Sequence, residues 1–127
     1  MLGIDNCLRR IMDIPGAASA TLMDDSGLVV ATAGQHPLLD EHENAALTTD
    51  ALRAVFGCAA FQCDVTNLAG AELIVAHVGG YHLLRSVGDG PNSRLYLHAV
   101  FGEAIGNLAI SRFKVREILR DWLSSST

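Results

Sequence analysis

Three strand-like runs follow one another in the second half of the chain, with only short turns between them. They are Glu72–Val78, Tyr81–Val87 and Arg94–Phe101. Short turns join antiparallel neighbours, whereas parallel strands need a long crossover connection. Apolar residues occupy successive positions in these runs, as in segment 73–76, instead of alternating with polar ones. In an antiparallel sheet with one face in solvent, apolar and polar residues alternate along each strand. These runs do not alternate, so we expect helices to cover both faces of this sheet.

Three helical patterns and two further strand-like runs surround these strands. The helices are predicted over Ile4–Asp13, Asp40–Phe56 and about Asn107–Leu123, and the strands over Ala17–Met23 and Leu28–Ala33. Each helix carries an apolar stripe, and the two strands form a hairpin around a polar turn that ends in Gly27. The order α-β-β-α-β-β-β-α predicts an α+β fold, a five-stranded antiparallel sheet with helices on both faces. The residues expected in its core are Leu8, Ile11, Leu22, Ile74, Leu83, Leu97, Ile118 and Trp122.

Length and charge narrow the class of protein. A chain of 127 residues is the size of one domain, which we expect to span residues 1–127. Fourteen acidic against nine basic residues give a net charge of −5, which argues against a nucleic-acid partner. No apolar run is long enough to span a membrane or form a signal peptide, so we expect a cytoplasmic protein without membrane insertion. The odd cysteine count, Cys7, Cys58 and Cys63, predicts reduced thiols.

The usual catalytic signatures are missing from the sequence. The only lysine, Lys114, lies in the last helix, so there is no phosphate-binding loop. The nucleophile elbow G-x-S-x-G and the zinc pair H-E-x-x-H are absent as well. We therefore expect no enzyme activity, and no residue is nominated as catalytic, cofactor-binding or metal-ligating.

Histidines form the one cluster that could bear chemistry. If Gly79-Gly80 is a two-residue turn, His77 and His82 lie directly opposite each other, with His98 on the next strand nearby. Three imidazoles on one face could bind a metal or respond to pH. The alternative is a purely structural role, in which these histidines form the polar margin of a sheet face that a helix only partly covers. His36 and His42 are expected to be solvated.

Four motifs make the chain resemble the Roadblock/LAMTOR domains, also called the dynein light chain roadblock type. They are the segments IPG (14–16), DSGLVVAT (25–32), LLRSVGDG (83–90) and GNLAISRF (106–113), in this order over nearly the whole chain. Residues 58–70 and the insert 90–93 depart from the family pattern. The resemblance implies a profilin-like fold, homodimers or heterodimers, no catalysis and no cofactor. It further implies a scaffold or regulator of a Ras-like small GTPase, and bacterial members similar to the gliding-motility regulator stimulate GTP hydrolysis by a partner. The alternative function is a small-molecule or metal-sensing domain with a His77, His82 and His98 cluster.

An unprotected strand edge predicts where the chain pairs with its own copy. Glu72–Val78 has one sequence-local partner strand and no proline or lysine to protect its other edge. The second helix carries an apolar side made of Ala46, Leu47, Ala51, Ala54 and Val55, and the resemblance implies that it packs against its copy. The predicted dimer interface is therefore Leu73, Ile74, Val75, Ala76, His77, Ala51 and Val55. The GTPase is expected on the surface of the paired second helices, around Glu41, Glu43, Thr48 and Arg53.

Overall fold

The computed structural model describes residues 3–88, 95–102 and 107–125. Within these ranges the order α-β-β-α-β-β-β-α is confirmed, with one additional short 3-10 turn, η1. The elements are α1 (Ile4–Met12), β1 (Ala17–Asp24), β2 (Val29–Gly34), α2 (Glu41–Phe56), η1 (Ala59–Phe61), β3 (Glu72–His77), β4 (Gly80–Val87), β5 (Leu95–Gly102) and α3 (Leu108–Ser125). The turn predicted over residues 89–93 and the start of the predicted strand at Arg94 lie outside the described residues.

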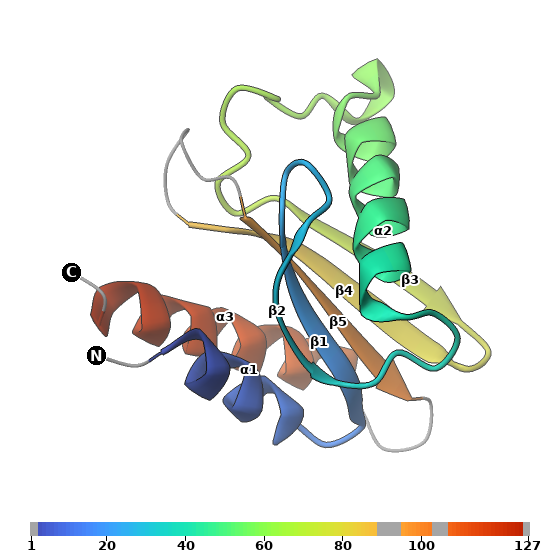
Figure 1. The fold of residues 1–127 in the computed structure, drawn as a ribbon. Coiled ribbons are helices and arrows are strands. Elements are labelled where there is room, and N and C mark those ends of the chain that lie inside the picture. Colours follow the sequence, from blue (N-terminus) through green and yellow to red (C-terminus); the bar gives the residue numbers. More distant parts are fainter. Residues whose placement is uncertain (1–2, 89–94, 103–106, 126–127) are drawn as a thin grey trace.

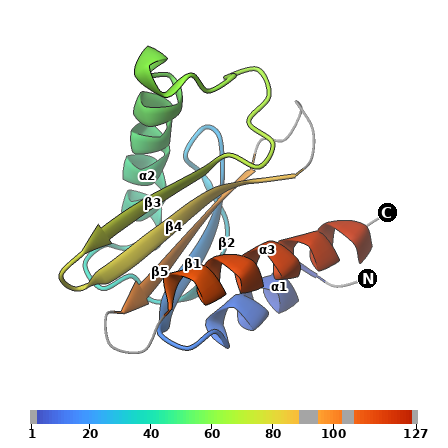
Figure 2. The same ribbon diagram turned by 180° about the vertical axis from the view of Figure 1, so that it is seen from behind.

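All five strands form one antiparallel sheet in the order β2-β1-β5-β4-β3. Figures 1 and 2 show α1 and α3 side by side on one face of this sheet and α2 on the other. Because helices cover both faces, apolar residues of the central strands occupy successive positions instead of alternating with polar ones. Strands β2 and β3 form the two edges.

The larger core lies between the sheet and the α1–α3 layer. Seven of the eight residues predicted for it are buried, among them Ile11 and Leu83 with no exposed surface and Trp122 with 9% exposed. Ile74 is the exception, because it lies on the edge strand β3 and is only partly buried. A smaller core of Leu52, Phe56 and Leu84 lies under α2.

The helix boundaries follow local hydrogen bonds that the sequence predicts. Asp40 caps α2, since its Oδ1 accepts from the backbone N–H groups of His42 and Glu43 at 2.8 and 2.9 Å. Asn107 accepts from the backbone N–H of Ile110 at 3.2 Å and begins α3. The predicted hairpin turn before β2 is held by Asp24, whose Oδ1 accepts from Ser26 and Leu28.

The tight turn between β3 and β4 is one residue earlier than predicted. His77 pairs with Gly80, so the loop consists of Val78 and Gly79 and not of the two glycines. Gly80 belongs to strand β4, with φ of 140°. A side chain at Gly80 would collide with the carbonyl oxygen of Phe101 on β5, which explains why glycine stands there.

Cys7, Cys58 and Cys63 are free thiols, and burial raises the pKa of the Cys7 thiol to about 11. None of the described helices combines the length and the apolar character needed to cross a membrane.

Candidate interaction surface

Strand β3 leaves one edge of the sheet open. Within the described residues its only neighbour is β4, so the backbone groups along its outer edge have no partner strand. Glu72, Leu73 and Ile74 are half-buried, whereas Ala76, His77 and Val75, which is 46% exposed, face solvent. An apolar edge of this kind without proline or lysine is a template for pairing with another chain.

Helix α2 exposes several apolar residues to solvent and buries polar residues beside apolar ones against the sheet. Its buried residues are three polar ones, Asn44, Thr48 and Thr49, and three apolar ones, Ala45, Leu52 and Phe56. Ala46, Ala51, Ala54 and Leu47, which is 57% exposed, lie on the surface. In a helix that packs only against its own sheet, apolar residues gather on the buried side and polar residues on the side that faces solvent. The exposed apolar residues of α2 are therefore a candidate surface for contact with another protein.

Helix α2 and strand β3 meet at the small core. Val55 of α2 and Leu73 of β3 both pack at the margin of the small core around Leu84. Val75 and His77 lie on the same face of β3 as Leu73, because alternate residues of a strand share a face. Of the predicted interface residues, Val55 and Leu73 therefore pack in one cluster, and Ala51 is exposed on α2. Ile74 packs against the larger core on the opposite face, which Ala76 shares by the same alternation.

The predicted partner-binding residues do not all reach the surface. Glu41, Glu43 and Arg53 are exposed on α2. Arg53 is 3.3 Å from Asp50 and also donates to the backbone carbonyl of Asp25. Thr48 is wrong as a contact residue, because it is 8% exposed and faces the sheet one turn after Asn44.

The histidine cluster exists, with a different geometry and one more member than predicted. His82 faces Val75, so His77 and His82 are diagonal neighbours on one face and not directly opposite. Their ring centroids are 5.2 Å apart, and those of His82 and His98 are 5.1 Å apart. His36 is not solvated as expected but lies over the cluster, with its centroid 6.0 Å from that of His98. His42 is exposed, as expected.

Hydrogen bonds determine which nitrogens carry protons in this cluster. The Oδ1 of Asn44 can only accept, so His98 donates to it from Nδ1 at 3.1 Å and keeps a lone pair on Nε2. His82 therefore donates from Nδ1 to that Nε2 at 2.8 Å. Burial, reinforced by the neighbouring imidazoles of His82 and His36, lowers the pKa of His98 to about 3. Burial lowers the pKa of His82 and His36 as well.

These hydrogen bonds leave the cluster poorly suited to hold a metal. Both ring nitrogens of His98 are occupied, and Nδ1 of His77 accepts from the backbone N–H of Gly79. Nδ1 of His36 accepts from the N–H groups of Leu38 and Leu39. Across the described residues, no three His, Cys, Asp or Glu side chains are arranged to hold a metal ion.

Sequence reasoning missed Asn44 and His36 as members of this network. The signal for Asn44 was its spacing, since Asn44, Thr48 and Leu52 follow the i, i+4, i+8 pattern of one helix side. No local pattern marks His36, which follows the end of β2 and reaches the cluster through the fold.

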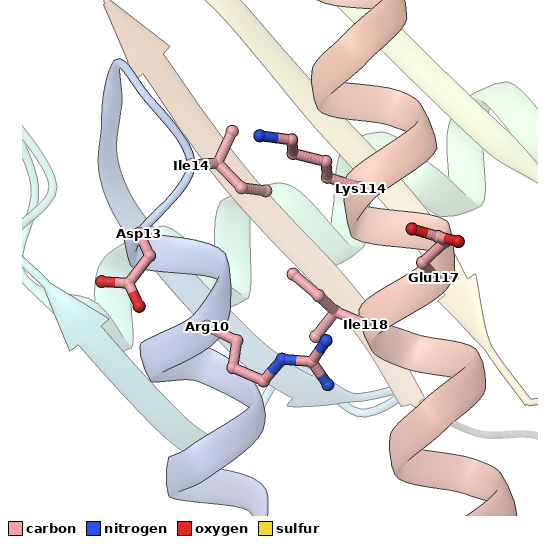
Figure 3. A pocket seen from close by; sticks show the side chains of 6 residues that line it. All are labelled: Arg10, Asp13, Ile14, Lys114, Glu117 and Ile118. Atoms are coloured by element: carbon pink, nitrogen blue, oxygen red, sulfur yellow. The ribbon is translucent and has the colours of Figure 1, made fainter.

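A hollow between α1 and α3 lies on the other side of the molecule. It has a volume of about 240 Å³ and is lined by side chains of both helices and of the turn after α1. Figure 3 shows Arg10, Asp13, Lys114 and Glu117 around it. Two positive and two negative side chains balance each other, so the hollow selects no sign of charge.

No protein-family model and no curated protein sequence matches this chain. Solved structures match it over nearly its whole length. A Roadblock/LC7 domain from Streptomyces avermitilis is 18% identical, with a TM-score of 0.71 over 94% of this chain and 94% of that one. Myxococcus xanthus MglB is 22% identical, with a TM-score of 0.72 over 95% and 93%. A structure described as MglB with tetrameric arrangement is 18% identical, with a TM-score of 0.72 over 94% and 88%. The chain therefore has the roadblock fold.

Proposed function

We propose that the protein is a non-catalytic homodimeric module that binds a Ras-like small GTPase. The observation that supports this most directly is the exposed apolar side of α2 beside the open edge of β3. A surface of this composition is stable in water when a second protein surface covers it. The roadblock fold, shared with MglB, agrees with the sequence motifs that resemble GTPase regulators.

In the proposed dimer, β3 pairs with its own copy and α2 packs against its copy on one face. Two-fold pairing gives both chains the same contact and closes the edge. The two sheets then form one continuous sheet of ten strands, twice the five of a single chain. Leu47, Ala51 and Val55 become buried, which removes the unfavourable exposure of apolar side chains on α2.

A glutamate on the exposed side of α2 tests the dimer. Ala51→Glu introduces a charge from each copy into the proposed contact, and we expect light scattering to show a monomer where the original protein is a dimer. Arg9→Glu, on the exposed surface of α1, is the control for added negative charge and should remain a dimer. A monomeric original protein at tens of micromolar, or an unchanged Ala51→Glu dimer, contradicts the proposed interface.

The proposed GTPase surface is the one formed by the paired α2 helices, where Glu41, Glu43 and Arg53 are exposed. The test uses a small GTPase encoded near the gene of this protein, loaded with GDP or with a non-hydrolysable GTP analogue. We expect binding in one nucleotide state and a weaker complex after Glu43→Lys. A protein that dimerises but binds the GTPase in neither state contradicts the partner and leaves the dimer intact.

A further inference from the structure

Four arginines gather where α3 crosses the ends of β3 and β4. Arg112, Arg116 and Arg120 follow the i, i+4, i+8 spacing that places them on one side of α3. Arg112 donates from Nε to Glu72 at the start of β3 at 2.7 Å, so this side of α3 faces the edge strand. Arg85 of β4 lies 3.2 Å from the second oxygen of the same carboxylate. Figure 2 shows α3 on this face of the sheet.

A hollow of about 260 Å³ lies beside these arginines. Three guanidinium groups, two glycines and apolar residues of α3 share in its lining, which includes Arg85, Arg116, Arg120, Gly70, Gly88 and Leu119. We call this hollow the arginine pocket. Pockets for drug-sized molecules occupy about 300–1,000 Å³. The arginine pocket is smaller and suits a small ion, or one charged group of a larger ligand.

Among the residues that the structure describes, the ion pairs around the arginine pocket leave positive charge in excess. Glu72, 11% exposed at its side chain, is shared between Arg85 and Arg112. Neither Arg116 nor Arg120 has a carboxylate partner among the described residues. Four guanidinium groups and one carboxylate leave a local charge of +3 in a chain whose net charge is −5. The positive charge is therefore concentrated at one place on an acidic protein.

We propose that the arginine pocket binds a phosphate-type dianion, as free phosphate or as a phosphate ester on a larger ligand. Guanidinium groups form paired hydrogen bonds with phosphate oxygens and keep their charge at every physiological pH. A single carboxylate would neutralise only part of the excess charge, whereas a dianion neutralises most of it. Open space at Gly70, where an added Cβ would meet nothing within 4 Å, leaves room for the anion to approach the backbone.

The test is an NMR titration of the full chain with inorganic phosphate at constant ionic strength. We expect saturable shifts of the amide signals of Gly70 and Gly88 and of the arginine Nε–H groups. Double substitution of Arg116→Gln and Arg120→Gln should weaken binding by about tenfold or more, because two charged hydrogen-bond donors are lost. Both residues are exposed and pair with no carboxylate of the described part of the chain, so the variant should keep the fold.

Arg9→Gln is the matched control, because Arg9 is exposed on α1 and outside the pocket lining. It removes one positive charge, against two in the double variant, and should leave the affinity unchanged within a factor of about two. O-phosphoserine, titrated in the same way, distinguishes a phosphate ester from free phosphate as the ligand. Tighter binding of O-phosphoserine than of phosphate assigns the pocket to esters. Equal or weaker binding assigns it to the free ion. Shifts that do not saturate, or that Arg9→Gln reduces as much as the double variant, overturn the proposal.

Discussion

Acidification from pH 7 to pH 5 should destabilise this fold, and the largest share of the loss should come from the imidazole of His98. His98 is 5% exposed, donates to Asn44 and accepts from His82, and its pKa of about 3 compares with 6.5 for an ordinary histidine. Below pH 6.5 the unfolded chain binds a proton at this position, whereas the folded chain does not until pH approaches 3. The unfolded state thus gains protons first, so the free energy of unfolding falls as pH falls.

The size of the loss follows from the difference between the two pKa values. For one such group, each pH unit below 6.5 lowers the free energy of unfolding by about 1.4 kcal/mol. At pH 5 the loss is about 2 kcal/mol, and it approaches about 5 kcal/mol near pH 3. The pKa values of His82 and His36 are also lowered by burial, so both add to the loss with the same sign. Hydrogen bonds lower the pKa of Asp24 and Asp64 below 3.8, so these carboxyl groups contribute only under more acidic conditions.

Urea unfolding at fixed protein concentration, repeated between pH 7 and pH 5, measures this dependence. His98→Gln keeps a side chain that can hydrogen-bond Asn44 but cannot titrate, so its loss over this interval should be about 2 kcal/mol smaller than that of the original protein. The change with pH is the readout, and a general destabilisation by the substitution does not affect it. His42→Gln, on an exposed histidine of α2, should leave the dependence unaltered. A His98→Gln protein that loses as much stability as the original would refute the assignment.

Two local substitutions test the packing of the helices by urea unfolding at pH 7. Trp122→Ala should lower the free energy of unfolding by about 3–5 kcal/mol, because Trp122 belongs to the core between α1, α3 and the sheet. A loss below about 1 kcal/mol would mean that α3 packs more loosely than the structure shows. Asp40→Ala should cost about 1 kcal/mol, since two backbone N–H groups of α2 lose their acceptor. Asp40→Asn keeps that acceptor and should recover most of the loss.

Most elements of this fold are predictable because their signals are local. The stripe of Leu8 and Ile11, the cap at Asp40 and the polar turn at Asp24 each involve residues within one or two turns of chain. The open edge at β3 also follows from the sequence, since a strand entered from a long segment has only one local partner. The family motifs add the order of the elements, and the solved structures with the same fold agree with it.

The register of the β3–β4 turn depended on a contact between strands. Two consecutive glycines fit a tight turn, but Gly80 is needed inside β4, where the backbone of β5 approaches closely. Thr48 likewise has the polarity of a surface residue, and only the hydrogen bonds with Asn44 and His98 explain its burial. The residues that decide these two positions lie on other elements of the fold, so a local sequence pattern does not include them.

By itself the sequence determined the helices, the strands, the exposed edge and the acidic character of the chain, because hydrophobic period, capping and charge are properties of neighbouring residues. Only the tertiary structure decided which side of α2 faces solvent, which histidines meet, and that Arg85 joins Arg116 and Arg120 around one hollow. His82 and His98 are 16 positions apart in the chain, and Arg85 is 31 positions from Arg116. Antiparallel strand pairing together with helix packing brings them together.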